Sequence, residues 1–178
     1  MQLIQLERIT RLGRLGESLV AERLRDFSFT EIENLNQRRV NFPFADLLAA
    51  RDGTRYLIGV KTRNEMQQGE VKLNESYNLV LIRSSLNAEL KRQGKTPQDI
   101  TNLLLAEVEE LAKHHNAIPA WATVAVRPKV GTYSAYFGLV SELGGRRSVP
   151  MTSKYFEKYL CLAKDNFDSR ITSELLNS

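Results

Sequence analysis

The sequence predicts an α/β fold, a single-domain α/β sandwich with a central mixed sheet that contains a hairpin. Two observations predict this class. Stretches in which apolar residues recur at helical spacing alternate with short stretches rich in Val, Ile, Leu and aromatic residues. The pair Asp52-Gly53, a strong turn signal, lies between two apolar runs and predicts an antiparallel hairpin. A hairpin argues against a purely parallel, doubly wound sheet, so the sheet should mix both strand directions.

The first expected element is an amphipathic helix over residues 3–26. Its apolar residues recur at helical spacing, at Leu12, Leu15, Leu19, Val20 and Leu24. Gly13 and Gly16 would each weaken a free helix by about 1 kcal/mol relative to alanine. Their presence predicts that another element packs closely against this turn. Glu17 borders the packing face, so its carboxylate is placed to reach over the edge of a sheet.

The central part of the chain is expected to supply strands. Residues 27–35 form the first strand, and the hairpin follows with strands at about 42–50 and 54–62. Residues 64–77 are polar and predict a loop or a short irregular segment. Residues 77–82 (Tyr-Asn-Leu-Val-Leu-Ile) predict a buried strand because they form a nearly continuous apolar run.

The second half is expected to open with two helices. Residues 87–92 predict a short helix, and a longer one begins at Thr96, with Pro97 at its first position and Asp99 at its third. The longer helix extends to about His115. Its core side is expected to comprise Ile100, Leu103, Leu104, Val108 and Leu111.

The end of the chain is expected to add strands and a helix. Residues 120–126 and 133–140 predict a pair of strands, residues 152–166 an amphipathic helix, and residues 171–176 a last turn. Cys161, the single cysteine, falls inside that helix and is expected to be buried by packing. One cysteine cannot form an internal disulfide, which agrees with a reducing compartment.

Composition favours a soluble, cytoplasmic protein. Of the 178 residues, 42% are hydrophobic and 26% are charged, as in ordinary globular domains. No stretch approaches the roughly 18 apolar residues that span a bilayer, and the start lacks an apolar signal region, so no membrane partner is expected. The sequence has no repeats and no break in composition, which predicts one domain over residues 1–178.

Two ionisable residues interrupt the apolar runs of the hairpin. Asp46 lies on its first strand and Lys61 on its second. Charged side chains rarely lie inside such runs unless they are paired or bind a metal. A structural alternative remains open, in which Asp46 caps the end of a strand or pairs with Arg55 or Lys61 across the hairpin.

This part of the chain resembles the core of the PD-(D/E)xK nuclease superfamily, which has the restriction-endonuclease-like fold. The resemblance lies in Asp46, in the triplet Gly59-Val60-Lys61 and in Glu17. In that family an Asp ends one strand, an acid-x-Lys triplet lies on the next, and an earlier helix often adds a glutamate. The similarity covers about residues 8–85. It implies a Mg²⁺ or Mn²⁺ site in which Asp46, Glu17 and the Val60 carbonyl are ligands. Lys61 would then activate water or stabilise charge on the phosphate.

One position departs from the family pattern, because Gly59 stands where the family has an acid. Gly59 and Lys61 lie on the same side of the strand, so the missing carboxylate would point at the metal. Three explanations remain open. An acid of the following segment (Glu65, Glu70 or Glu75) reaches back, or two carboxylates suffice once a DNA phosphate binds. In the third, catalysis is lost and a DNA-binding or assembly role remains.

The net charge of +4 and the pI near 9.3 are compatible with a polyanionic partner. Positive side chains cluster around the candidate site, and the expected phosphate contacts are Arg14, Arg38, Arg39, Arg63, Arg146 and Arg147. The resemblance therefore implies an endonuclease-like hydrolase acting on DNA. The alternative is a catalytically impaired DNA-binding or assembly module of the same fold. The resemblance also implies a homodimer as one arrangement, since nucleases of this fold frequently cut both strands as dimers.

Overall fold

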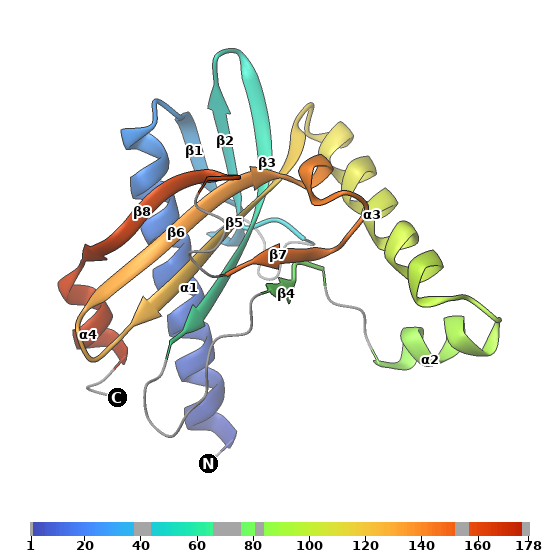
Figure 1. Cartoon of the computed structure of the whole chain (residues 1–178), viewed down its shortest axis with the longest axis horizontal. Coiled ribbons are helices and arrows are strands. Elements are labelled where there is room, and N and C mark those ends of the chain that lie inside the picture. Colours follow the sequence, from blue (N-terminus) through green and yellow to red (C-terminus); the bar gives the residue numbers. More distant parts are fainter. Residues whose placement is uncertain (1, 38–43, 66–75, 81–83, 152–156, 176–178) are drawn as a thin grey trace.

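The computed structural model describes residues 2–37, 44–65, 76–80, 84–151 and 157–175, which form a mixed α/β fold (Figure 1). Its main sheet is curled and has six strands in the order β1-β2-β3-β5-β6-β8. These strands are β1 (Thr30–Asn34), β2 (Leu47–Arg51), β3 (Thr54–Asn64), β5 (Ile118–Arg127), β6 (Thr132–Leu139) and β8 (Leu160–Phe167). β3 and β5 pair in parallel, whereas the other neighbouring pairs are antiparallel. The prediction of an α/β fold with a mixed sheet is confirmed.

The remaining described elements are helices, turns and a small ribbon. The helices are α1 (Gln2–Asp26), α2 (Ser84–Arg92), α3 (Pro97–His114) and α4 (Ser169–Leu175). The 3₁₀ turns are η1 (Leu35–Gln37) and η2 (Val140–Leu143), and β4 (Ser76–Asn78) pairs with β7 (Ser148–Pro150) in the ribbon. Among the described helices, none combines the length and the apolar character needed to cross a bilayer.

Successive residues of the hairpin strands pack against different helices. Leu47 and Ile58 belong to the core that includes α1, whereas Leu48 and Leu57 pack with Ala112 of α3. Because successive side chains of a strand point to opposite faces, α1 and α3 cover opposite faces of the sheet. Figure 1 shows the long α1 crossing the sheet and α3 standing on the other side.

The hairpin forms where the sequence predicts it. Asp52 and Gly53 have φ values of 52° and 75°, the left-handed pair that a two-residue type I′ turn requires. β2 pairs with β3 as far as Leu47 opposite Ile58, and Leu47 is the first residue of β2. β3 continues to Asn64, paired with β5 on its other side. Beyond Ile58, this edge of β3 therefore faces the segment that precedes β2.

Helix α1 approaches β3 most closely at Gly16. A Cβ added there would come within 1.8 Å of Thr62 Oγ1, so the approach depends on glycine. The prediction of close packing is confirmed at Gly16. It is wrong at Gly13, where an added Cβ would meet nothing within 4 Å. The close approach at Gly16 brings the next residue, Glu17, to the edge of the sheet.

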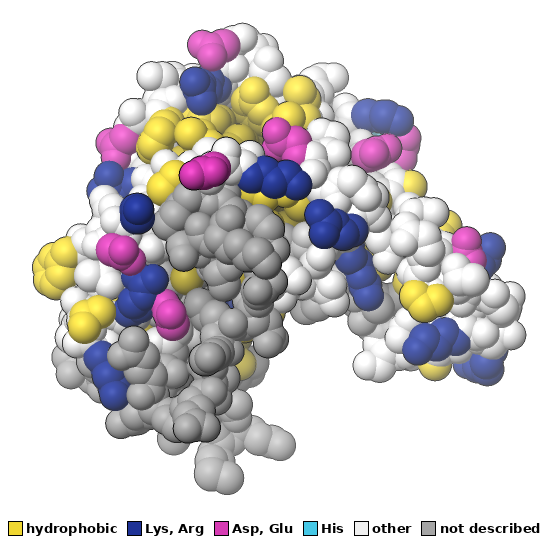
Figure 2. All heavy atoms as spheres, viewed as in Figure 1, with side chains coloured by type: hydrophobic (Ala, Val, Ile, Leu, Met, Phe, Trp, Pro, Cys, Tyr) yellow, Lys and Arg dark blue, Asp and Glu magenta, His cyan; other side chains and the backbone are white. Residues whose placement is uncertain are grey.

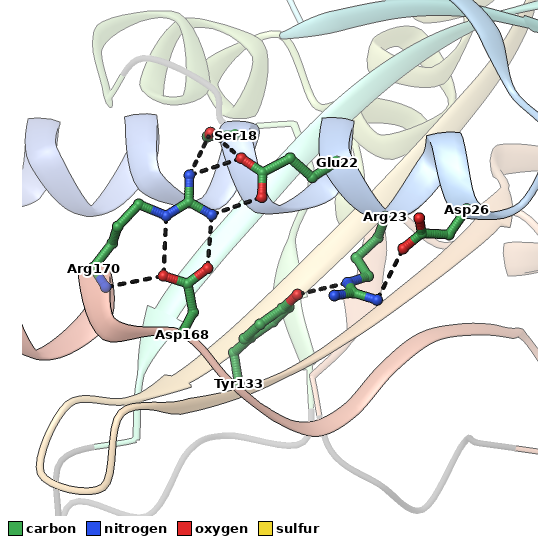
Figure 3. Close-up of polar contacts among 7 residues, drawn as sticks. All are labelled: Ser18, Glu22, Arg23, Asp26, Tyr133, Asp168 and Arg170. Atoms are coloured by element: carbon green, nitrogen blue, oxygen red, sulfur yellow. Dashed lines mark hydrogen bonds and ion pairs between the residues drawn. The ribbon is translucent and has the colours of Figure 1, made fainter.

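The C-terminal elements are fastened to α1 by polar contacts (Figure 3). Arg170 of α4 donates to both carboxylate oxygens of Glu22, at 2.7 and 2.6 Å, and to Asp168 at 2.7 Å. Arg23 donates to the hydroxyl of Tyr133 on β6 at 2.8 Å. Helix α1 is thereby held to α4 and to β6 at two separate points.

Helix α3 begins as the sequence predicts. The Thr96 hydroxyl accepts from the backbone of Asp99, and the Asp99 carboxylate accepts from the backbone of Thr96, which completes a capping box ahead of Pro97. Its core side is narrower than expected, because Leu103 is 45% exposed while Ile100, Leu104 and Val108 are buried.

The predicted strand over residues 77–82 is confirmed in part. Of its described residues, Tyr77 and Asn78 lie in the short strand β4, whereas the buried Leu79 and the partly buried Val80 follow that strand. Residues 81–83 lie outside the described residues. The apolar run therefore contributes to the core without joining the main sheet, because β4 pairs with β7 instead.

The predicted helix over residues 152–166 is wrong. Residues 160–167 form β8, which pairs with β6, and residues 152–156 lie outside the described residues. The apolar run Leu160–Ala163 is compatible with either element, and pairing with β6 decides in favour of a strand. Cys161 is consequently a partly buried strand residue opposite Tyr136. The predicted last turn is confirmed as α4.

Candidate functional site

Asp46 lies just before β2, where β3 extends past the start of its partner. Its backbone N–H donates to the Ile58 carbonyl at 2.9 Å, and its carboxylate Oδ2 accepts the N–H of Val60 at 2.7 Å. The Asp46 side chain thus accepts the Val60 hydrogen bond that the backbone of a neighbouring strand would otherwise accept. The expected position on a strand is corrected by one residue, since β2 begins at Leu47.

Glu17 reaches the same place from α1. Glu17 as a whole is only 8% exposed, and its carboxylate accepts two amide hydrogen bonds, from Asn34 Nδ2 at 2.8 Å and from Asn36 Nδ2 at 3.1 Å. The same Asn36 nitrogen also donates to Asp46 Oδ1, at 3.0 Å. One amide nitrogen therefore bridges the two carboxylates that the sequence predicts to be neighbours.

Lys61 approaches Asp46 from the other side. It is two residues beyond Gly59 on β3, so it points to the face that α3 covers, opposite to that of Val60. Burial lowers the pKa of its ammonium group, and the charge of Arg63 lowers it further, while the Asp46 carboxylate opposes both. Lys61 in turn lowers the pKa of Asp46. The predicted acid and amine therefore do interact, at the edge of β3.

The environment disfavours charge on both carboxylates. Burial raises the pKa of Glu17, and the neighbouring Asp46 raises it further, against the hydrogen bonds from Asn34 and Asn36 and the charge of Arg14. Burial also raises the pKa of Asp46, against the hydrogen bonds from Val60 and Asn36. Two partly desolvated carboxylates beside each other form a site that a cation would stabilise.

Position 59 has no room for a side chain. A Cβ added to Gly59 would lie 2.8 Å from the backbone oxygen of Phe44 and 3.1 Å from atoms of the Phe44 and Leu79 side chains. A backbone oxygen cannot move aside as a flexible side chain can. The space that an acidic side chain would need at position 59 is therefore already filled.

Of the acids suggested as substitutes, Glu65 is excluded. Its carboxylate accepts a 2.6 Å bond from Arg127 of β5, which also pairs with Asp165. Glu70 and Glu75 lie outside the described residues. Among the described residues, no group of three His, Cys, Asp or Glu side chains is placed to hold a metal ion.

A cleft of about 720 Å³ opens beside Glu17. Its walls come from α1 and from β1 with η1, and they include Arg14, Ser18, Glu22, Glu33, Asn34 and Asn36. The cleft gives a ligand access to Glu17 from the α1 side of the sheet, whereas Asp46 does not line it.

The predicted phosphate contacts are divided between the two sides of the site. Arg14 lies on α1 close enough to Glu17 to lower its pKa. The Arg63 guanidinium lies over the Tyr77 ring, 4.6 Å from its centroid, and Arg147 donates to the carbonyl of Val80 at 3.5 Å. Arg146 donates to the carbonyl of Leu143, at the end of η2.

Arg38 and Arg39 lie outside the described residues. On the face shown in Figure 2, Lys and Arg side chains form a short run between the end of β6 and α3.

Sequence reasoning missed the two asparagines of the site. Asn34 ends β1, inside the predicted first strand, and Asn36 lies in η1, just beyond that strand. Their spacing in Asn34-Leu35-Asn36, with the buried Leu35 between two amides, is the one local signal that both side chains share an environment. No family model, curated protein or solved structure matches this chain.

Proposed function

We propose that this chain is a DNA-acting protein with a restriction-endonuclease-like fold that hydrolyses phosphodiester bonds with Mg²⁺ or Mn²⁺. One observation carries the proposal. Glu17, Asp46 and Lys61, which come from α1, the start of β2 and β3, meet at one sheet edge. Three charged groups brought together at an apolar edge are costly for stability, which favours a functional role over a structural one.

The donor set suits a hard divalent cation. Glu17 and Asp46 supply carboxylate oxygens that already face one nitrogen. The N–H and C=O of one strand residue point to the same side, so the Val60 carbonyl is directed toward Asp46 together with its N–H. Two carboxylates, one carbonyl and water are ordinary ligands for Mg²⁺.

Each residue then has a distinct part in the reaction. A cation held by Glu17, Asp46 and the Val60 carbonyl would supply Lewis-acid activation of the phosphate and of the attacking water. Lys61 stabilises the negative charge that develops on the phosphate, and its lowered pKa suits proton exchange with the water. Arg14 and Arg63 neutralise flanking phosphates of the DNA backbone. The DNA strand would enter through the 720 Å³ cleft beside Glu17, from the α1 side of the sheet.

A specific observation favours the second candidate, a non-catalytic DNA-binding or assembly module. The acid of the family triplet is absent, and the Phe44 carbonyl fills the space where it would stand. The site would then have too few acidic ligands to hold the cation firmly. In that case the Asp46 carboxylate and the Lys61 ammonium group would only stabilise each other's charge inside the fold.

Plasmid nicking separates the two candidates. The wild type is incubated with supercoiled plasmid and Mn²⁺ beside Asp46→Asn and Lys61→Met. Matched controls are Glu110→Gln and Lys113→Met, which remove an exposed ion pair of α3. If the wild type and both controls nick the plasmid and the two site variants do not, the result supports the nuclease.

Two other outcomes decide against it. Salt-sensitive DNA binding without nicking establishes the module, because release of counterions makes such binding weaken with salt. Failure to bind DNA at low salt overturns both candidates.

A further inference from the structure

Two arginines mark the ends of the wall that α1 contributes to the 720 Å³ cleft. Arg14 is the first and Arg25 the last residue of α1 that lines it, and both are exposed. They are eleven residues apart, which is three helical turns, so they lie on one face of α1 with about 16 Å between their Cα atoms. Within the described part of the chain, neither guanidinium forms a hydrogen bond or an ion pair.

The other arginines of α1 whose side chains are described lie outside the cleft and have partners. Arg11 pairs with Glu7 at 3.7 Å, and Arg23 donates to the Tyr133 hydroxyl and pairs with Asp26. The same helix therefore satisfies its arginines away from the cleft and leaves them without partners inside it. Guanidinium groups bind phosphates through paired hydrogen bonds, so this arrangement favours a phosphate-bearing ligand in the cleft.

The carboxylates that line the same cleft are engaged within the protein. Glu22 accepts from two nitrogens of Arg170, at 2.7 and 2.6 Å (Figure 3). Glu17 accepts two amide hydrogen bonds at the edge of the sheet, and one carboxylate oxygen of Glu33 is buried. The arginines are thus the charged groups of the cleft that are best placed to meet a ligand.

The size and the lining of the cleft suit one nucleic-acid strand. Spread along about 16 Å, its volume gives a cross-section of about 45 Å², roughly 7 Å on a side. A duplex, whose major groove alone is about 12 Å wide, is too broad to enter. Between the arginines, Gln37 adds an exposed amide, and Ala21 and Ile32 add apolar surface. Amides bind base edges and apolar groups contact bases, and both are accessible when the bases are unpaired.

We propose that the cleft between α1 and β1 binds single-stranded DNA lengthwise, with Arg14 and Arg25 each holding a backbone phosphate. The inference rests on the proposed function and names a single strand as its substrate. At 3.4 Å or more for each nucleotide, about three to five nucleotides span the distance between the two arginines. Arg25 lies more than two helical turns beyond Glu17, so it holds the strand away from the carboxylates.

Fluorescence anisotropy tests the inference on the full chain, with a short labelled oligo(dT) and a duplex of equal length, in EDTA so that no metal takes part. We expect the wild type to prefer the single strand. Arg25→Met should weaken oligo(dT) binding about tenfold, as loss of a charge-assisted hydrogen bond does. It should also reduce the slope of log K against log salt by about 0.7, the value for one phosphate contact on a single strand.

Arg11→Met is the matched control, because it removes the same charge from the same helix outside the cleft. We expect it to leave the affinity and the salt slope unchanged. Unfolding midpoints show whether each variant is folded.

The outcomes separate the inference from the function on which it rests. If the duplex binds more tightly, or if folded Arg25→Met and Arg11→Met lose the same affinity, the inference is wrong, while plasmid nicking that depends on Asp46 keeps the proposed function. If no DNA binds at low salt, both fall. A preference for the single strand that Arg25→Met loses and Arg11→Met keeps establishes the cleft as the binding site.

Discussion

Two glycines of α1 provide a matched pair that tests how the site is held in place. Gly13 and Gly16 lie one turn apart in the same helix, and replacing either by alanine makes the same chemical change. At Gly13, the new Cβ meets nothing within 4 Å. At Gly16, it would lie 1.8 Å from Thr62 Oγ1 and 2.8 Å from two further atoms of that side chain, which is buried.

The expected effects have opposite signs. Alanine stabilises a helix by about 1 kcal/mol relative to glycine, so Gly13→Ala should raise the free energy of unfolding by about that amount. Overpacking of a buried contact costs about 1–3 kcal/mol, and the extreme closeness at Gly16 places it at the upper end. The propensity gain offsets part of this cost, which leaves a net loss of about 2 kcal/mol for Gly16→Ala. For a chain of this size, we expect Tm to rise by about 3 °C in the first variant and to fall by about 6 °C in the second.

Thermal unfolding followed by circular dichroism measures both values. Thr62→Ala in the Gly16→Ala background should recover part of the loss, and the double-mutant cycle gives the coupling between the two residues. Mn²⁺ binding should also weaken in Gly16→Ala alone, because the displaced helix carries Glu17 away from Asn36. Equal Tm changes in the two single variants would refute the idea that Gly16 sets the distance between α1 and the sheet.

Three further predictions concern the site and its support. The pKa values of Glu17 and Asp46 are raised above their ordinary 4.5 and 3.8. The contribution of the two protonated carboxyl groups to the stability of the fold is therefore complete below these ordinary pKa values. It is lost as pH rises through the raised pKa values, and we expect a flatter profile of Tm against pH for Asp46→Asn. Gly59→Ala should lower the free energy of unfolding, measured with urea, by about 1–3 kcal/mol, because the backbone oxygen of Phe44 faces the new Cβ and cannot move aside. An unchanged free energy would mean that position 59 has room for a side chain. Arg170→Met should lose about 1 kcal/mol through its paired bonds to two carboxylates, whereas Arg92→Met, which breaks an exposed pair, should have no measurable effect.

The parts of the fold that local chemistry determines could be predicted from the sequence. Asp52-Gly53 specifies its own turn, and Thr96 with Asp99 specifies the start of α3. The segment over residues 160–167 could not be assigned in this way, because its apolar run suits a helix or a strand and only pairing with β6 decides. Local pattern fails where the partner lies elsewhere in the chain.

The candidate site shows the same division. Asp46 and Lys61 are conspicuous in the sequence because they interrupt apolar runs, and they do interact. The role of Asn36 depends on a backbone path that brings η1 between α1 and the start of β2, and nothing in the sequence specifies that path. The obstruction at Gly59 likewise comes from a backbone oxygen, which carries no sequence signal of its own.

The attachment of α4 to α1 bears on how the protein matures during translation. Glu22 lies one turn and a residue beyond Glu17 on α1, and its partner Arg170 is among the last described residues to leave the ribosome. The N-terminal helix is therefore synthesised long before the residue that anchors it. The nascent polypeptide therefore carries α1 without this ion pair until Arg170 has been synthesised.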